Sequence, residues 1–189
     1  MPLIDFTTRP GAIEGLQVIT TKQISDERGT VREYFRASAY GSLGSGGLSH
    51  CAQVNVTFTR RGAIRGLHGE AMTKLVGVVS GEAFGAYVDA RRQSPTFGTL
   101  QVVELTVGTQ VLVPEGVLNG FQSVSQDGCE YLYGFDTEWT ANMAGVGANA
   151  LDPALGIAWP IEVDPDDRSL LSAKDAALPT FSALDGAAS

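Results

Sequence analysis

Short runs of branched and aromatic residues, separated by turn signals, recur through most of the sequence. They lie at 16–20, 30–35, 51–59, 74–80, 82–90, 98–106, 109–114, 119–124 and 129–136. Apolar and polar residues alternate within 54–59 and 100–106, as expected of strands that bury one face. Glycine, proline and polar residues mark turns between these runs. Many short strands at this spacing predict an all-β protein, folded as a jelly roll or double-stranded β-helix.

Two segments differ from this pattern. Residues 40–50 are rich in glycine, which predicts a flexible loop with no packing face. Residues 169–189 show helix-like spacing that then fades, which predicts a short C-terminal helical segment. No repeat and no second domain is visible, so we expect a single domain over 1–189. Its core should span about 15–180 and be followed by a loose tail over 181–189.

Charge and composition narrow the classes of partner. The net charge of −8 argues against nucleic-acid binding, although a few arginines would suffice for a small phosphorylated ligand. No apolar run approaches the roughly 18 residues needed to cross a membrane. The N-terminus lacks the layout of a signal peptide, and two cysteines are too few for a disulfide framework. We therefore expect a cytoplasmic protein.

His68 is one of two histidines and admits three interpretations: a catalytic base, a metal ligand or a core histidine. It follows Arg65 by three residues and precedes Lys74 by six. A divalent metal in a jelly roll would need several imidazole and carboxylate ligands, and the other histidine, His50, is expected beyond two strands. The ligand count therefore argues against a metal. The base and the core histidine remain open.

Three further polar residues each have an ordinary structural explanation. Asp175 lies in a terminal turn, where a solvated carboxylate is usual. Tyr133 shares a strand face with Tyr131, so the pair can be simple packing. Lys74 begins an apolar strand, a common place for an exposed charge. Spacing alone does not decide between these explanations and a functional site.

An ordered series of motifs covers nearly the whole chain. They are DERGTVREYF (26–35), QVN (53–55), RGLH (65–68), KLV (74–76), GE (81–82), VDARRQSPTFG (88–98), VPEGVLNGF (113–121), EYLY (130–133), LDPALGIAWP (151–160) and LSAKD (171–175). In this order they resemble the dTDP-4-dehydrorhamnose 3,5-epimerases, the RmlC-like branch of the cupin jelly rolls. The resemblance extends from about residue 15 to 180.

This resemblance implies a reaction without a cofactor or a metal. The substrate would be a nucleotide-diphosphate 4-keto-6-deoxy sugar, typically dTDP-linked, whose ketone acidifies the hydrogens at C3 and C5. Epimerisation then needs a base, an acid on the opposite face, and a group that stabilises the enolate oxygen. His68 matches the base, and Asp175 the carboxylate paired with it. Tyr133 matches the acid, and Lys74 the cation near the enolate oxygen.

The resemblance also implies a set of binding residues and a partner. Arg28 and Arg65 would hold the diphosphate or the sugar, because the guanidinium fork suits phosphate. Glu33 would lie near the nucleotide base, and Gln53 and Asn55 along the pocket. In this family a strand from the partner subunit completes the site, so we expect a homodimer.

The sequence departs from the family pattern at several binding positions. Asn119 stands where the family usually has histidine, and asparagine can hydrogen-bond a sugar but does not titrate near neutrality. Trp139 replaces the second of two tyrosines, and Val31 an aromatic residue that often stacks on the nucleotide base. The segment 69–73 is shorter than usual and lacks a tyrosine–glutamine pair and a proline. Asn119 and Trp139 are expected to line the pocket.

Three functions fit these residues. The first is epimerisation of a nucleotide-linked 4-keto-6-deoxy sugar at C3, C5 or both, in deoxysugar biosynthesis. The second is a sugar-nucleotide ketoisomerase, which uses similar enolate chemistry. The third is a catalytically silent sugar-nucleotide binding protein, which the retention of both His68 and Asp175 disfavours.

Overall fold

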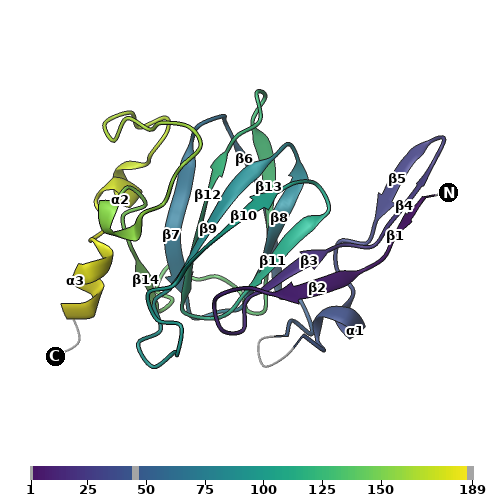
Figure 1. Ribbon diagram of the computed structural model, residues 1–189, viewed down its shortest axis with the longest axis horizontal. Coiled ribbons are helices and arrows are strands. Elements are labelled where there is room, and N and C mark those ends of the chain that lie inside the picture. Colours follow the sequence, from purple (N-terminus) through teal and green to yellow (C-terminus); the bar gives the residue numbers. More distant parts are fainter. Residues whose placement is uncertain (1, 44–46, 187–189) are drawn as a thin grey trace.

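The computed structural model describes residues 2–43 and 47–186 (Figure 1). Its strands are β1 Leu3–Ile4, β2 Thr7–Pro10, β3 Gln17–Thr20, β4 Gln23–Asp26, β5 Gly29–Arg32, β6 Gln53–Thr59, β7 Ile64–Glu70, β8 Lys74–Ser80, β9 Ala83–Asp89, β10 Leu100–Leu105, β11 Thr109–Val113, β12 Val117–Ser123, β13 Cys129–Phe135 and β14 Gly145–Gly147. Its helices are α1 Ala37–Tyr40, η2 Pro153–Leu155, α2 Ala173–Ala176 and α3 Phe181–Gly186.

Two antiparallel sheets face each other and form the jelly roll that the strand pattern predicted. One sheet has six strands in the order β2-β3-β11-β8-β13-β6, and the other has five in the order β10-β9-β12-β7-β14. A third, small sheet of β1, β4 and β5 projects away from the sandwich, on the side opposite α2 and α3 (Figure 1). The prediction of an all-β jelly roll with a short C-terminal helical segment is confirmed.

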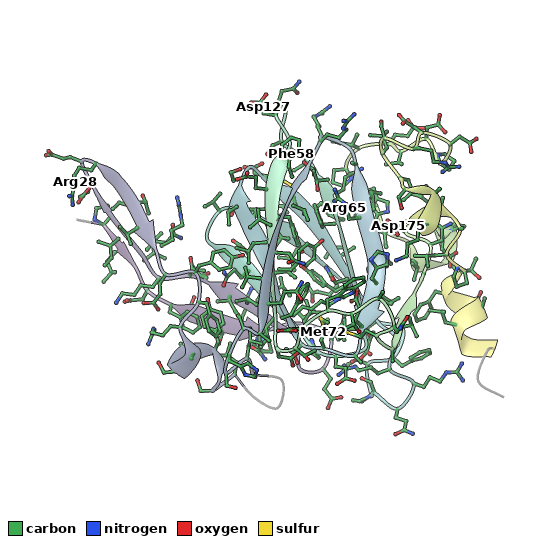
Figure 2. All side chains as sticks on the ribbon, turned by 180° about the vertical axis from the view of Figure 1, so that it is seen from behind. Arg28, Phe58, Arg65, Met72, Asp127 and Asp175 are labelled. Carbon is green, nitrogen blue, oxygen red and sulfur yellow. The ribbon has the colours of Figure 1, made fainter. Side chains whose placement is uncertain are left out.

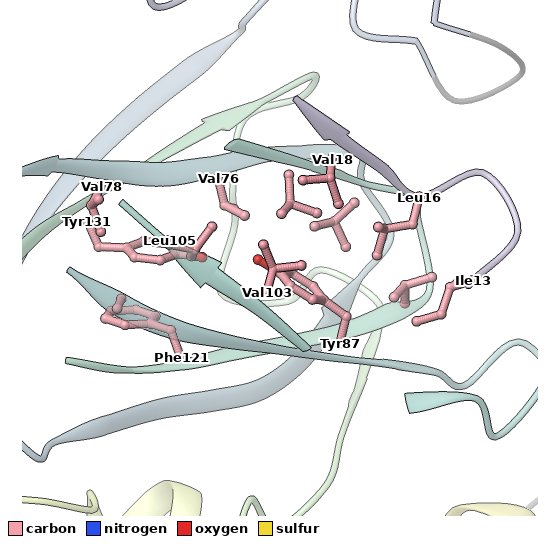
Figure 3. Close-up of a cluster of buried hydrophobic side chains, with 14 of the residues drawn as sticks. Ile13, Leu16, Val18, Val76, Val78, Tyr87, Val103, Leu105, Phe121 and Tyr131 are labelled. Carbon is pink, nitrogen blue, oxygen red and sulfur yellow. The ribbon is translucent and has the colours of Figure 1, made fainter. Parts of the chain in front are cut away.

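The main core lies between the two sheets (Figure 3). Phe121 of β12 stacks on Tyr131 of β13, with ring centroids 3.8 Å apart and an interplanar angle of 4°. Val76 and Val111 of the six-stranded sheet and Leu105 of the five-stranded sheet are fully buried in the same cluster. Each such side chain contributes about 1.5–3 kcal/mol by leaving water, so this layer holds the two sheets together.

A second core covers the outer face of the five-stranded sheet. Leu67 of β7 and Leu118 of β12 are fully buried there. Ala150 and Leu171, from the long C-terminal segment, pack against them. The Trp159 indole N–H donates to the carbonyl of Ala150 at 2.8 Å. The sheet is thus buried on both faces, which explains why every residue of β12 is buried.

Two predictions about the irregular segments were wrong. Residues 181–186 form α3 instead of a loose tail, because Phe181 and Leu184 pack on the second core and the N–H of Phe181 donates to Asp152 Oδ2 at 2.8 Å. The glycine-rich segment 40–50 also packs: Tyr40 and Leu48 are fully buried against the outer face of the six-stranded sheet, in a cluster with Ile19, Leu75 and Leu112. The part of each prediction that falls on 44–46 or 187–189 lies outside the described residues.

None of the helices in the described part of the chain has the length and apolar character needed to cross a membrane.

Candidate active site

A cavity of about 180 Å³ opens between the two sheets at one end of the sandwich. It is lined from both sheets and from the loop after β13, by Asn55, Thr57, Arg65, His68, Glu70, Lys74, Asn119, Tyr133, Phe135 and Trp139. Seven of these side chains are positions that the sequence predicted as site residues, namely Asn55, Arg65, His68, Lys74, Asn119, Tyr133 and Trp139. The fold therefore gathers most of the expected site into one hollow.

An irregularity in β7 places two of these residues on the same side of the strand. His68 pairs with Asn119 of β12, but Arg65 pairs with Phe121, so β7 has one residue more than β12 between the two pairs. Without this bulge, residues three apart on a strand would face opposite sides. Gly66 makes the bulge: its φ is +120°, and a Cβ there would lie 2.6 Å from the Cα of Gly120. Only glycine fits this close approach.

His68 is held by a carboxylate from a distant part of the chain. Its Nε2 lies 2.8 Å from Oδ1 of Asp175. Asp175 belongs to the short helix α2, where the hydroxyl of the N-cap residue Ser172 accepts from the Asp175 N–H at 3.0 Å. Figure 2 shows Asp175 close to Arg65, on the side of the sandwich that the C-terminal segment covers. The second core sets this contact, because it fixes the C-terminal segment against β7.

The surroundings of Asp175 keep its carboxyl group ionised. Burial raises its pKa, but the hydrogen bond from His68, the charge of His68 and the hydrogen bond from Ser172 together bring the pKa below its ordinary value. A carboxylate has no proton to give, so the Nε2–H of His68 must be the donor in this pair. The neutral imidazole then carries its lone pair on Nδ1, the nitrogen that a base uses.

Lys74 and Glu70 form a second charged pair in the cavity. Lys74 Nζ donates to Glu70 Oε2 at 2.6 Å and to the carbonyl oxygen of His68 at 3.0 Å. The Lys74 side chain is 3% exposed and that of Glu70 is 23% exposed. Burial lowers the pKa of Lys74, and the neighbouring carboxylate of Glu70 opposes that shift.

Tyr133 faces the cavity in a mainly aromatic layer. Its ring centroid lies 4.8 Å from that of Tyr131 and 5.8 Å from that of Phe135. Burial raises the pKa of Tyr133 well above its ordinary value; the charge of Arg65 opposes this, and the charges of Glu70 and Asp175 add to it. The phenol therefore stays protonated at neutral pH and holds its proton at the cavity.

Gln53 supports the cavity wall without lining it. Its side-chain oxygen accepts from the backbone N–H of Trp139 at 2.9 Å, and its nitrogen donates to Asn55 Oδ1 at 3.1 Å. These two bonds fix Trp139, whose own side chain is half-exposed, beside Asn55. Asn119 is 5% exposed and lies next to His68 across the β7–β12 pair.

Two expected binding residues lie away from the cavity. Arg28 is at the tip of the β4–β5 hairpin, far from Arg65 and Asp175 (Figure 2), with its side chain 90% exposed and paired with Asp26 at 2.6 Å. Glu33 follows β5 and pairs with Arg36. Within a single chain these residues do not meet the rest of the site, so their assignment stays a prediction.

The structure adds residues that the sequence interpretation missed. The cavity is also lined by Glu70, Thr57 and Phe135. Each lies two positions from a predicted site residue on the same strand. Because side chains two positions apart on a strand share a face, this spacing could have identified them. A second hollow of about 450 Å³ adjoins His68 and Arg65 and is also lined by Arg60 and Arg168. No cluster of three or more His, Cys, Asp or Glu side chains suited to a metal ion occurs within residues 2–43 and 47–186.

Comparison with known proteins agrees with this geometry. The family model described as dTDP-4-dehydrorhamnose 3,5-epimerase matches residues 10–183. The chain belongs to the dTDP-4-dehydrorhamnose 3,5-epimerase family. Within this epimerase family, the dTDP-4-dehydrorhamnose 3,5-epimerase of Salmonella typhimurium is 35% identical over 89% of this chain and 91% of the relative. A dTDP-4-dehydro-6-deoxyglucose 3-epimerase of Streptomyces bikiniensis is 34% identical over 93% and 89% of the two chains.

Solved structures of the epimerase family superpose closely on this chain. NovW, a 4-keto-6-deoxy sugar epimerase of Streptomyces spheroides, matches with a TM-score of 0.88 at 28% identity, covering 97% of this chain and 92% of that one. The Legionella pneumophila 3,5-epimerase in complex with dTDP-4-keto-L-rhamnose matches with a TM-score of 0.84 at 32% identity, covering 96% of each chain. The resemblance that the sequence motifs indicated is therefore confirmed.

The depressed pKa of Asp175 predicts an acid-sensitive contribution to stability. A carboxyl group with a lower pKa in the folded state than in the unfolded state stabilises the fold above its unfolded pKa of about 4 and loses that contribution as the pH falls through the folded pKa. Urea unfolding of the wild type, measured in steps from pH 6 to pH 2.5, should therefore show a decline in unfolding free energy. In Asp175→Asn this decline should be smaller. Asp127→Asn, at an exposed turn, is the control and should follow the wild type. An equally steep decline in Asp175→Asn would contradict the assignment.

Proposed function

We propose that this protein is an epimerase of a dTDP-linked 4-keto-6-deoxy sugar, acting at C3, C5 or both. The observation that carries the proposal is the 2.8 Å contact of His68 with Asp175 at the wall of a cavity that also contains Lys74 and Tyr133. The Salmonella and Streptomyces relatives named above are epimerases of dTDP-sugars, which supports this substrate class.

The proposed reaction uses His68 as the base. Its Nδ1 takes the proton from the carbon next to the ketone, and the ionised Asp175 stabilises the resulting imidazolium through Nε2. The electron pair of the broken C–H bond moves to the ketone oxygen and forms an enolate. Lys74 stabilises that oxygen through an N–H group, as in an oxyanion hole. Tyr133 returns a proton to the carbon from the opposite face, which inverts the centre as the enolate returns to the ketone. Tyr133 then regains a proton from solvent, and the His68 imidazolium releases the proton that it took to solvent.

Arginines beside the cavity support a diphosphate ligand. Arg65 is held by Thr59, whose hydroxyl accepts from the Arg65 Nε–H at 2.9 Å, so that its guanidinium lies between the cavity and the second hollow. Arg60 and Arg168 add positive charge on that side. We propose that the sugar occupies the cavity and the diphosphate extends past Arg65.

We also propose a homodimer in which the projecting hairpin serves the partner's site. Val31 on this hairpin is 76% exposed, and Phe58 on the edge strand β6 is 61% exposed. Exposed apolar residues on an edge strand favour pairing with a second copy. Such pairing would also give Arg28 and Glu33 a place beside a nucleotide.

Deuterium exchange tests the enzyme directly. Wild type incubated with dTDP-4-keto-6-deoxyglucose in deuterated water should incorporate deuterium at C3, C5 or both, read by NMR, and product analysis separates epimerisation from ketone migration. His68→Ala should slow exchange by about 10²-fold or more, because the base is gone. His50→Ala replaces the other histidine, which is exposed, and should exchange like the wild type. The absence of exchange with this sugar and with its cytidine, uridine and guanosine analogues would refute the epimerase.

Mixed dimers test whether Arg28 acts in the partner's site. His68→Ala and Arg28→Ala should each be impaired alone, but a dimer with one subunit of each kind contains one site with both native residues. Random mixing after unfolding and refolding should therefore restore about a quarter of wild-type activity, since half the dimers are mixed and each has one intact site. If mixing restores nothing while both variants remain folded and dimeric, Arg28 acts within its own subunit or not at all.

A further inference from the structure

Glu70 is a charged cavity residue to which the proposed reaction assigns no role. It lies at the end of β7, and its Oε2 accepts a hydrogen bond from Lys74 Nζ at 2.6 Å. The two side chains are four residues apart in sequence and are brought together by the tight connection between β7 and β8. The Lys74 side chain is almost fully buried, so this contact is shielded from water.

The donors of Lys74 can be counted. An ammonium group has three N–H donors and no acceptor. One donates to Glu70 and one to the backbone carbonyl oxygen of His68, at 3.0 Å. A single N–H therefore remains for the cavity that Lys74 lines. Because both acceptors belong to β7, the strand that carries the base also fixes the direction of this free N–H.

The charge of Lys74 depends on a neighbouring anion. A buried amine favours its neutral form, and an opposite charge within about 4 Å restores the ammonium. Burial accordingly lowers the pKa of Lys74, and the charge and hydrogen bond of Glu70 raise it again. Other ionisable groups line the cavity or lie close behind it, namely Arg65 and His68 on β7, Tyr133 on β13, Asp175 on α2, and Asp136, whose N–H donates to the carbonyl of Thr73. Among the described residues, Glu70 is the one carboxylate that bonds to Lys74.

We propose that Glu70 is a positioning residue that keeps Lys74 charged and directs its one free N–H at the substrate oxygen. Glu70 itself does not contact the reacting atoms in this arrangement; it acts through Lys74. The inference rests on the proposed function, since it concerns the group that stabilises the enolate. It also gives the shortened segment 69–73 a role, because this segment brings Glu70 and Lys74 together.

The pH dependence of Glu70→Gln tests this role. The variant keeps the shape and a hydrogen-bond acceptor but removes the charge. The alkaline limb of kcat/KM, where Lys74 loses its proton, should move to lower pH by about one to three units. At the optimum kcat should fall, while KM for the dTDP-sugar stays within about twofold. Glu70→Asp should recover part of the shift, and Glu130→Gln, an exposed glutamate on β13, should leave the profile unchanged. An unchanged alkaline limb in Glu70→Gln would overturn the proposal.

A second measurement needs no turnover. The chain has three lysines, Lys22, Lys74 and Lys174, so selective ¹³C labelling resolves each side chain by NMR. The titration midpoint of Lys74 should fall in Glu70→Gln, while Lys22 and Lys174 serve as internal controls. A Lys74 midpoint that does not change would refute the role of Glu70 even in an active epimerase. If the Lys74 midpoint falls but the wild type exchanges no deuterium, the effect of Glu70 on Lys74 is supported. That result would count only against the proposed epimerase activity.

Discussion

The site depends on the packing of the C-terminal segment against the outer face of the five-stranded sheet. That segment buries Leu171 and Ala150 on β7 and β12, and in doing so carries Asp175 to His68, 107 residues earlier in the chain. Without this second core the carboxylate would have no fixed position and His68 would be an ordinary partly exposed histidine. The hydrogen bond between them therefore joins two segments 107 residues apart in the sequence at the candidate catalytic centre.

The cavity combines groups of opposite charge in a small volume. The carboxylate of Asp175 contacts the His68 ring on one side, and the carboxylate of Glu70 pairs with Lys74 on the other. Both pairs are anchored on β7, whose bulge at Gly66 turns Arg65 and His68 to the same side. One strand therefore sets the relative positions of the proposed base His68, of Arg65 and, through Glu70, of Lys74. Arg28 and Glu33, which we expect near the nucleotide, lie away from the cavity of their own chain. This is why the proposed site includes a second subunit.

Much of the fold and part of the site could be predicted from the sequence. The alternation of apolar and polar residues predicted the sandwich, and ordered motifs predicted the gathering of His68, Lys74 and Tyr133 with Asp175. The ion pair of Glu70 with Lys74 was missed because it depends on a short strand connection whose geometry no local pattern encodes. The helix over 181–186 was also missed, since its stability comes from packing on the second core and not from its own sequence. The single-domain organisation and the roles of Arg28 and Glu33 stay predictions.

The central claim is that Asp175 fixes His68 as a base with its lone pair on Nδ1. The chain has two histidines, so ¹⁵N NMR of labelled protein can assign both rings. At a pH where the His68 ring is neutral, we predict a protonated Nε2 and an unprotonated Nδ1, and in Asp175→Asn a mixture of the two tautomers. A proton on Nδ1 in the wild type, or a tautomer that is the same in Asp175→Asn, would contradict the account.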